Sequence, residues 1–468
     1  MIDLDRFPAL LVEHLPQHLG RQRWSGAHDR AITSVSVRWH EVVCQGDDVA
    51  MVWALVDVHF AGSHEAEPEE QSFQVFVGVR HVQDRAGFLE GKDREILATV
   101  ECCAESGPVV LYDALVDPDL AIAVLHLVAP DVHVEVRRPL VLEHSNSSVV
   151  FDETRILKIF RRVLPGPNPD VEITRVLSER GYGHVLAPLA ELRRDDTDLA
   201  VLRDFLVGSV EGWQLARTSV RDLLASRLPP EESGGDFAPD AERLGSILGG
   251  LHLAMAEAWG ANPGDPRRWA REMDAHLRDL VRDGSLDVHP SQLDTGAVAD
   301  RYAALEKLDD AGSEIRIHGD LHLAQVIHAD AGWYVLDFEG EPARRRDDRF
   351  TTSSPLRDVA GMLRSFHYAA ATGLTEWVDV GEEPDAELVA LADAWDQRSR
   401  AAFLAGYASV EGIDALLPSD PEARLAVLSA FELDKAVYEV GYELGYRPEQ
   451  ASIPLSGIDR LIRGPVPT

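Results

Sequence analysis

The sequence predicts an α+β protein whose N-terminal half mixes strands and helices and whose C-terminal half is mostly helical. Three observations support this class. Apolar and polar residues alternate in several stretches of the first 90 residues, as in half-buried antiparallel strands. Between residues 134 and 208 the pattern becomes strand, strand, helix, strand, strand. From residue 209 onward apolar residues recur mainly at helical spacing.

These patterns divide the chain into three predicted domains. The first, residues 1–90, begins with an amphipathic helix at 7–19 and continues with strands at 32–43, 49–60 and 72–80. The second, residues 91–207, has a mixed stretch at 88–133, then strands at 134–143, 147–153 and 155–162, a helix from about 170 to Gly181, and strands at 186–194 and 198–208. The third, residues 208–468, has helices near 213–227, 242–259, 269–283, 298–308 and from 357 onward, interrupted by short strands at 315–319 and 333–340.

Composition and charge exclude several classes of function. The chain has 468 residues, with 45 basic and 80 acidic ones, for a net charge of −35. Such a charge disfavours nucleic acid and an anionic membrane surface as partners. No apolar run is long enough to cross a bilayer, the N-terminal segment lacks an apolar signal region, and the three cysteines cannot form a disulfide framework. We therefore expect a cytoplasmic protein without membrane or nucleic-acid partners.

The segment from Ile317 to Glu341 carries the chemistry. Asp320 follows a predicted strand and a His-Gly bend, and Gln325 comes five residues later. A second predicted strand delivers Asp337 and Glu339, which alternation would place on one face. Carboxylate and amide oxygens are the ligands that Mg²⁺ prefers, and phosphoryl transfer needs such ligands beside a base. We assign Asp320 as the base, Gln325 and Asp337 as magnesium ligands, and Glu339 as a third ligand or water-holding group.

This segment resembles the aminoglycoside phosphotransferase-like kinases, a branch of the protein-kinase-like superfamily. Further stretches, at 337–342, 354–370 and 435–443, are similar to the actinobacterial maltokinases. The resemblance implies a bilobal kinase-like fold with an N-terminal cap domain at 1–90. It also implies transfer of the γ-phosphoryl group of ATP, with Mg²⁺, to the anomeric hydroxyl of maltose. A functional link to trehalose synthase would follow from that activity.

A nucleotide site is predicted upstream. There is no glycine-rich loop, but a polar turn between two strands could present N–H groups and hydroxyls to phosphates. The next strand carries a lysine at the position of the phosphate-binding lysine of kinase-like lobes, and the following helix carries a possible glutamate partner. The predicted nucleotide-binding residues are Ser145, Asn146, Ser147, Ser148, Lys158 and Glu172.

The acceptor site is predicted near the C-terminus. Tyrosines recur there at i, i+4 and i+8 beside a row of glutamates, which would suit stacking and hydrogen bonding to a sugar. The same periodicity is also compatible with core tyrosines and a solvated acidic face. The predicted acceptor-binding residues are His322, Tyr438, Glu439 and Tyr442. Asp358 and Arg364 either brace the site or form an intrahelical ion pair.

Two alternatives to a maltose kinase remain. The first is a glucosamine or related aminosugar kinase, because the sequence lacks the tryptophan expected before Ile453 and departs from the maltokinase pattern near Arg23 and Trp24. The second is a catalytically idle kinase-like binding module. It would require the loss of the base or of a metal ligand, and both are present in the sequence.

Overall fold

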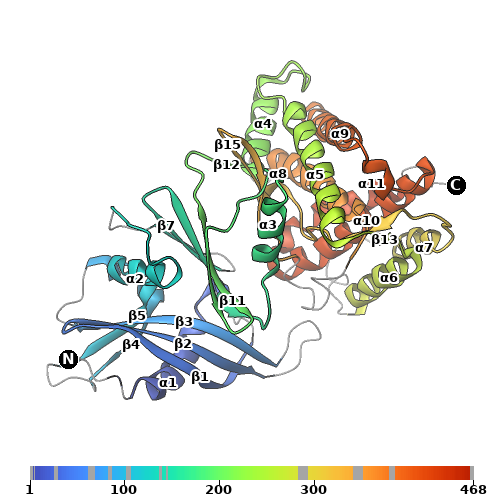
Figure 1. Cartoon of the computed structure of the whole chain (residues 1–468). Helices are drawn as coiled ribbons and strands as arrows, with labels where there is room; N and C mark the ends of the chain where they lie inside the picture. The colour runs from blue at the N-terminus through green and yellow to red at the C-terminus, as the bar shows by residue number, and fades with distance from the viewer. Residues whose placement is uncertain are drawn as a thin grey trace. The chain divides into compact units, whose positions relative to one another are not determined.

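The structure is a computed structural model and describes residues 4, 6–25, 30–61, 69–82, 87–101, 107–135, 140–143, 146–282, 293–340, 352–378 and 385–463. The described residues form two compact units (Figure 1). The first unit comprises residues up to Arg175 together with Leu186–Val207, and the second comprises Val176–Val185 and the residues from Gly208 onward. The predicted division into three functional domains stays a prediction.

A six-stranded antiparallel sheet forms the first part of the first unit. Its spatial order is β1-β2-β3-β5-β4, and the short β9 pairs with β3. The strands are β1 (Ile32–Gln45), β2 (Val49–Phe60), β3 (Glu70–His81), β4 (Ile96–Val100), β5 (Val109–Asp113) and β9 (Arg162–Val163). The sheet therefore includes strands on both sides of the predicted boundary at residue 90.

Both faces of this sheet are covered. Helix α1 (Phe7–Leu19) packs on one face, where Val52 and Ala54 of β2 join its core. Helix α2 (Pro118–Val128) packs on the other face, where Met51 and Trp53 are buried. The prediction of half-buried strands is thus wrong for β2 and β3, because a second layer supplied by later parts of the chain covers their other face.

A second antiparallel sheet completes the first unit, in the order β10-β11-β8-β7-β6. Its apolar face shares a core with α2 and the first sheet. The strands are β6 (Leu140–Glu143), β7 (Ser147–Phe151), β8 (Arg155–Ile159), β10 (Ala190–Arg194) and β11 (Thr197–Asp204). Helix α3 (Pro169–Glu179) follows the proline-containing loop, as predicted.

Buried polar contacts join the two sheets of the first unit. The guanidinium of Arg161 is fully buried, forms an ion pair with Asp113 of β5, and donates to Ser147 Oγ of β7 at 2.8 Å. The amide of Gln74 in β3 donates to the carbonyl oxygen of Leu199 in β11 at 2.5 Å. Each sheet thus satisfies polar groups of the other, since buried polar groups left unpaired would be destabilising.

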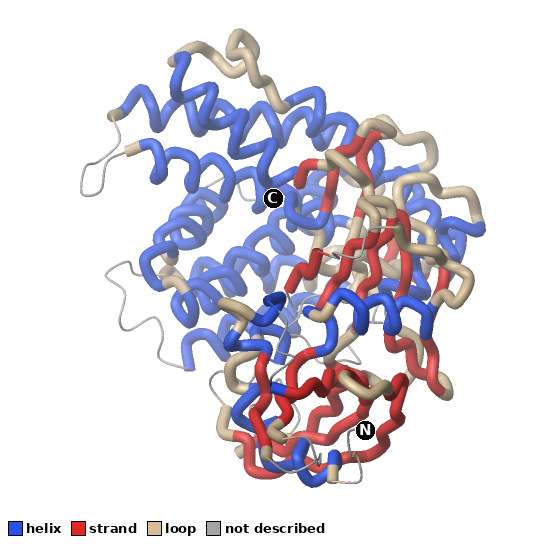
Figure 2. The backbone as a smooth tube through the Cα atoms, turned by 90° about the vertical axis from the view of Figure 1, so that its left-hand side faces the viewer, coloured by secondary structure: helices blue, strands red, loops and turns tan. Residues whose placement is uncertain are grey.

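Helices make up most of the second unit (Figure 2). They are α4 (Gly212–Ser226), α5 (Ala238–Trp259), α6 (Pro266–Arg282), α7 (Thr295–Leu305), α8 (Leu356–Trp377), α9 (Ala386–Ala408), α10 (Pro421–Tyr446) and α11 (Ser452–Arg463). Two small sheets accompany them: β12 (Val210–Glu211) with β15 (Val326–Ala329) and β16 (Gly332–Val335), and β13 (Asn262–Pro263) with β14 (Ser313–Glu314).

Two of the predicted strands differ from the structure. The predicted strand at 315–319 is extended chain, in which Ile315 forms an isolated bridge with Ser353. The predicted strand at 333–340 ends at Val335, and β15 pairs with it as a hairpin. Most apolar side chains of these segments are nevertheless buried, namely those of Ile315, Ile317, Trp333, Val335 and Phe338.

Glycines allow α5 and α9 to pack closely. A Cβ atom on Gly245 would lie 2.0 Å from the carbonyl oxygen of Phe403, and one on Gly406 would lie 1.9 Å from that of Glu242. Glycine is therefore required at both positions by the backbone of the facing helix.

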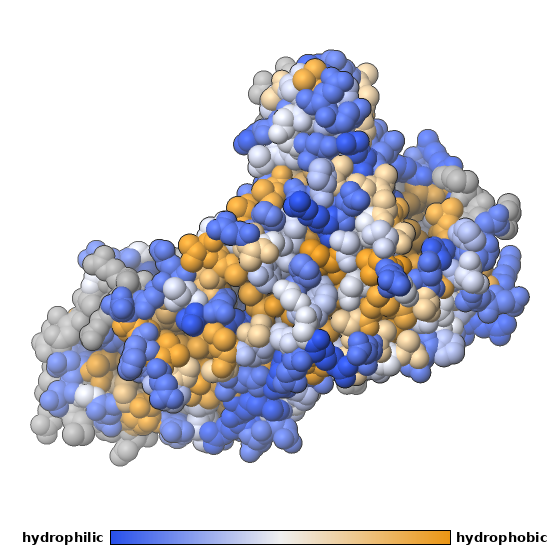
Figure 3. Space-filling view, turned by 45° about the horizontal axis from the view of Figure 1, so that its top comes forward, coloured by the Kyte–Doolittle hydropathy of each residue, from blue (hydrophilic) through white to orange (hydrophobic). Residues whose placement is uncertain are grey.

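Throughout the described ranges, no helix has both the length and the apolar character needed to span a membrane. The face drawn in Figure 3 mixes hydrophilic and hydrophobic residues, as expected for a chain with 27% charged residues.

Candidate active site

The loop that carries Asp320 is held by its own histidine. His318 is buried, and its Nε2 lies 2.8 Å from the carbonyl oxygen of Leu336. The backbone N–H of Asp320 donates to Nδ1 of the same ring at 3.3 Å. Gly319 between them has a φ of +86°, which an L-residue rarely adopts. His318 therefore has a structural role in this loop.

Asp358 of α8 fixes this loop from below. Its carboxylate accepts the backbone N–H groups of His318 and Gly319, each at 2.8 Å, and lies 3.1 Å from Nε2 of His252 in α5. The other ring nitrogen of His252 lies 2.8 Å from the hydroxyl of Tyr407 in α9. Burial opposes ionisation of Asp358, but the contact with His252 and the other donors outweighs it and lowers the pKa of the carboxyl. Asp358 therefore braces the site.

The predicted metal ligands of the second unit lie close together. Gln325 ends a 3-10 turn, and its Nε2 donates to Asp337 Oδ2 at 3.4 Å. Carboxylate oxygens of Asp337 and Glu339 approach within 4.8 Å of one another. Strand alternation is the wrong reason for this proximity, because the strand ends at Val335 and Asp337 has a φ of +62°. A turn brings the two carboxylates together instead, and their oxygen ligands suit Mg²⁺.

Asp320 forms an ion pair that the sequence did not indicate. Its Oδ1 lies 2.9 Å from Nζ of Lys435 in α10. Its Oδ2 lies 3.9 Å from Nε2 of His322. The Nδ1 of His322 accepts the backbone N–H of Ala324, so the proton of the neutral ring is on Nε2. Burial lowers the pKa of His322, against the attraction of Asp320.

The predicted acceptor tyrosines form a row along α10. The ring centroids of Tyr438 and Tyr442 are 6.5 Å apart, and those of Tyr442 and Tyr446 are 4.8 Å apart. Exposure increases along the row, to 45% at Tyr442 and 70% at Tyr446. The possibility that all three are core residues is therefore excluded for the last two. Lys435 begins the same row, with its ammonium 4.9 Å from the Tyr438 ring centre.

Two glutamates lie beside these tyrosines on α10. Glu439 accepts two hydrogen bonds from the buried guanidinium of Arg364, at 2.9 and 2.7 Å, which shows that Arg364 pairs between helices and not within its own. Glu443 accepts from Arg447 at 2.8 Å and from Tyr368 at 3.3 Å through the same oxygen, Oε1. Its buried Oε2 has no hydrogen-bond partner within the part of the chain that the structure describes. Burial raises the pKa of Glu443.

The predicted nucleotide residues lie in the first unit. Lys158 alternates with buried Leu157 and Ile159 on β8. Its Nζ lies 3.3 Å from Asp170 Oδ2, two residues before the expected partner Glu172. Arg203 shares this Asp170 oxygen at 2.9 Å.

The predicted polar turn is shorter than expected. Ser147 and Ser148 already belong to β7, and the buried Ser147 hydroxyl accepts from Arg161. Asn146 directly precedes the strand, and Ser145 lies outside the described residues. Strand pairing with β6 and β8 accounts for the difference.

Three partners of predicted site residues were missed from the sequence: Lys435 and His252 in the second unit, and Asp170 in the first. Lys435 is 115 residues from Asp320, and His252 is 106 residues from Asp358. Their partners depend on how distant helices pack, which periodicity does not define. Asp170 could have been found, since an acid in the first turn of the helix after Lys158 is visible in the sequence.

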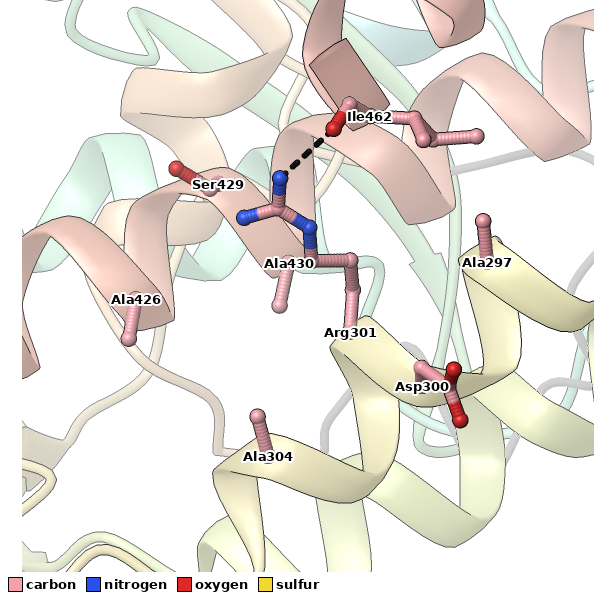
Figure 4. A pocket seen from close by; sticks show the side chains of 8 residues that line it. All are labelled: Ala297, Asp300, Arg301, Ala304, Ala426, Ser429, Ala430 and Ile462. Carbon is pink, nitrogen blue, oxygen red and sulfur yellow. Dashed lines mark hydrogen bonds between the residues drawn. The ribbon is translucent and has the colours of Figure 1, made fainter. Parts of the chain in front are cut away.

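A pocket elsewhere in the second unit contains none of the predicted site residues (Figure 4). It lies between α7, α10 and α11 and has a volume of about 360 Å³. Arg301 lines it and donates to the carbonyl oxygen of Ile462 at 2.8 Å, which satisfies the C-terminal end of α11. This pocket is separate from the acceptor row on the same helix α10.

Known proteins resemble this chain in sequence and in structure. No protein-family model matches it. A glucosamine kinase of Streptacidiphilus jiangxiensis is 26% identical over 331 residues, covering 68% of this chain and 71% of that protein. A glucosamine kinase of Mycolicibacterium smegmatis is 26% identical over 337 residues, covering 69% and 79%. A glucosamine kinase solved with glucosamine, ADP and inorganic phosphate has a TM-score of 0.63 at 20% identity and covers 97% of this chain and 99% of its own.

These comparisons confirm the predicted fold class. A second glucosamine kinase crystal structure gives a TM-score of 0.64 at 20% identity, covering 92% of this chain and 94% of its own. The chain therefore has the α+β, kinase-like fold of these proteins. Their names agree with the predicted alternative, an aminosugar kinase, better than with the maltose kinase predicted first. Neither maltose nor trehalose synthase finds support in these comparisons.

Proposed function

We propose that this chain is an ATP-dependent sugar kinase whose acceptor is an aminosugar of the glucosamine type. The observation that carries the proposal is the row on α10. Lys435 of this helix contacts Asp320, the predicted base. Two helical turns further on, beside the row, Glu443 has a buried oxygen without a hydrogen-bond partner among the described residues. A buried carboxylate oxygen of this kind is costly unless a cationic or hydrogen-bonding group meets it, and the ammonium of an aminosugar would do so.

Phosphoryl transfer assigns a role to each predicted residue. Asp320 would orient the acceptor hydroxyl and accept its proton late in the reaction, because most of the catalysis in this chemistry is positioning and charge neutralisation. Gln325, Asp337 and Glu339 would hold Mg²⁺, and their oxygen ligands fit that ion. When bound, the ion neutralises charge on the nucleotide phosphates.

The first unit would contribute the nucleotide contacts. Lys158, oriented by Asp170, would bind the phosphates of ATP, and Asn146 with Ser148 at the start of β7 would add polar contacts. Glu172, the partner predicted for Lys158, lies two residues after Asp170 in α3 and stays a predicted nucleotide-binding residue.

The charges on α10 also favour a particular hydroxyl. At 1.5 Å per residue, Glu439 and Glu443 lie about 6 and about 12 Å from Lys435 along the helix axis. An acceptor ammonium would be repelled by Lys435, and Glu443 Oε2, which has no hydrogen-bond partner among the described residues, would accept it. The phosphorylated hydroxyl beside Asp320 should therefore be remote from the amino group, such as the 6-hydroxyl of a 2-aminosugar, and not the adjacent anomeric hydroxyl.

An acceptor panel tests the proposal. Glucosamine, glucose, maltose and an aminoglycoside are each supplied with ATP and Mg²⁺, ADP release is followed, and the product is identified by ³¹P and ¹H NMR. We expect glucosamine to give the highest kcat/KM and a phosphate on a hydroxyl remote from nitrogen. Glu443→Gln should lower kcat/KM for glucosamine about tenfold or more and leave glucose nearly unchanged, because it removes only the charge.

The idle-module alternative is tested in the same assay. Asp320→Asn should lower kcat by about 10²–10⁴-fold, the usual contribution of a general base. The exposed Asp330, changed to Asn, is the matched control and should leave kcat unchanged. Absence of ATP turnover with every acceptor, or an Asp320→Asn enzyme as active as the wild type, would show that the proposed function is wrong.

A further inference from the structure

We propose that Lys435 is a positioning residue for phosphoryl transfer, which orients the carboxylate of Asp320 by holding one of its two oxygens. The inference rests on the proposed function, and it assigns to α10 a role in the chemical step besides acceptor binding. Its support comes from the contacts of Asp320 and from those that restrain Lys435 itself.

The ion pair has the geometry of an orienting contact. Lys435 Nζ lies 2.9 Å from Asp320 Oδ1, and the two side chains are only 16% and 15% exposed. The second oxygen, Oδ2, lies 3.9 Å from His322 Nε2, beyond the length of a hydrogen bond. The two oxygens therefore differ: Oδ1 is bound to an ammonium, and Oδ2 is the one that can turn to an acceptor hydroxyl.

Lys435 itself is held in a defined position. It lies within α10, and the adjacent Asp434 contacts Nδ1 of His276 in α6 at 2.9 Å. Its ammonium lies 4.9 Å from the ring centre of Tyr438, one turn along the helix, within the range of a cation–π contact. A lysine restrained in this way can fix the rotation of the carboxylate that it contacts.

The shared helix couples the acceptor to the base. Tyr438 and Glu439 follow Lys435 on α10, so a sugar bound along this row and the ammonium that orients Asp320 belong to one rigid element. Phosphoryl transfer gains most of its rate from such positioning, and displacement of a reacting group by about 1 Å can lower the rate about 10²-fold. Removing Lys435 should therefore affect kcat more than nucleotide binding.

A purely structural ion pair would behave differently. Removing one partner of a partly buried ion pair leaves the other charge unpaired and lowers stability. Lys435→Met should therefore lower the melting temperature whichever role the lysine has, so stability alone does not identify an orienting contact. A purely structural role predicts a normal kcat in the enzyme that remains folded, whereas an orienting role predicts a lowered kcat in the folded enzyme.

The experiment compares Lys435→Met and Lys435→Arg with the exposed control Lys307→Met in the full chain. For each protein we measure kcat, the KM for ATP and for glucosamine, ATP hydrolysis without acceptor, and the melting temperature. We expect Lys435→Met to lower kcat about 10²-fold with the KM for ATP changed less than about twofold. Lys435→Arg should restore at least about a tenth of the wild-type kcat, since the cation returns.

Acceptor-free hydrolysis separates orientation from folding. Transfer to the sugar needs the fixed carboxylate, whereas transfer to mobile water needs it less, so the ratio of hydrolysis to sugar phosphorylation should rise in Lys435→Met. Should this variant not fold, Lys435→Gln gives the same comparison. A folded variant with kcat within about twofold of wild type, or with an unchanged ratio, overturns the inference. A wild-type enzyme inactive with every acceptor would instead overturn the proposed function.

Discussion

Replacing Asp358 by asparagine removes one charge from the buried brace of the loop that carries Asp320 and keeps the shape of the side chain. In the wild type, Asp358 Oδ2 accepts from the His318 N–H and lies beside His252, and Oδ1 accepts from the Gly319 N–H. An asparagine amide has one acceptor oxygen and one NH₂ group. Whichever way it turns, its NH₂ group faces a donor, so at least one buried N–H loses its partner.

The contacts define the expected loss of stability. A buried unsatisfied N–H costs about 1–3 kcal/mol, and each remaining bond to a charged acceptor weakens by about 1 kcal/mol when the acceptor becomes neutral. Since the variant no longer buries a charge, part of this lost free energy is offset by the smaller desolvation cost. We expect Asp358→Asn to lower the free energy of unfolding by about 3 kcal/mol. A loop displaced by about 1 Å should also lower kcat about 10²-fold.

Urea unfolding followed by circular dichroism and steady-state kinetics measure the two effects, with the exposed Asp393→Asn of α9 as the control. The sign of the pH dependence follows from the lowered pKa of Asp358, whose ordinary value is 3.8. The stabilisation is present above about pH 4 and is lost as the pH falls through the folded-state pKa, so the difference between the two proteins should narrow only below pH 4. A difference under 1 kcal/mol at pH 7 with normal kcat would refute the assignment of Asp358 as a brace.

Two glycine substitutions test the packing of the second unit. Gly406→Ala places a Cβ atom 1.9 Å from the carbonyl oxygen of Glu242. It should lower the free energy of unfolding, measured by urea titration, by about 3 kcal/mol. The control Gly445→Ala places its Cβ atom in open space and should not destabilise the protein. Gly457→Ala places a Cβ atom 2.2 Å from Nη1 of Arg364. Arg364 holds Glu439, a predicted acceptor-binding residue, so we expect the substitution to raise the KM for glucosamine several-fold with an unchanged KM for ATP. Equal changes in both KM values would contradict the prediction that Glu439 binds the acceptor.

Much of the secondary structure could be predicted from the sequence, because periodicity is a local property. The helix at Phe7–Leu19 and the strands that follow it lie where alternation indicates. The burial of both faces of β2 could not be predicted, since α2 comes from residues 118–128. An alternating pattern indicates that one face of a strand is apolar. Whether the other face is also buried depends on tertiary packing, which the pattern does not define.

The site divides in the same way. Asp320, Gln325 and Asp337 belong to one short segment, so their chemistry and spacing are enough to predict phosphoryl transfer. The orienting contacts come from α10 and α5, and their pairing depends on helix packing that a single sequence does not specify. Strand alternation puts Asp337 beside Glu339 for the wrong reason, because the left-handed backbone of Asp337 is a turn feature that alternation does not predict.

The polar contacts between the two sheets of the first unit have a consequence for shortening the chain. Arg161 and Gln74 satisfy groups on both sheets, and β5 pairs with β3 across the position of residue 90. A chain begun at residue 91 would lack β3, so one edge of β5 would be unpaired. The Arg161 guanidinium would lose part of the protein that buries it, and the apolar face of α2 would be exposed. Such a fragment would aggregate, so the N-terminal strands belong to the smallest piece of this protein that can be prepared folded.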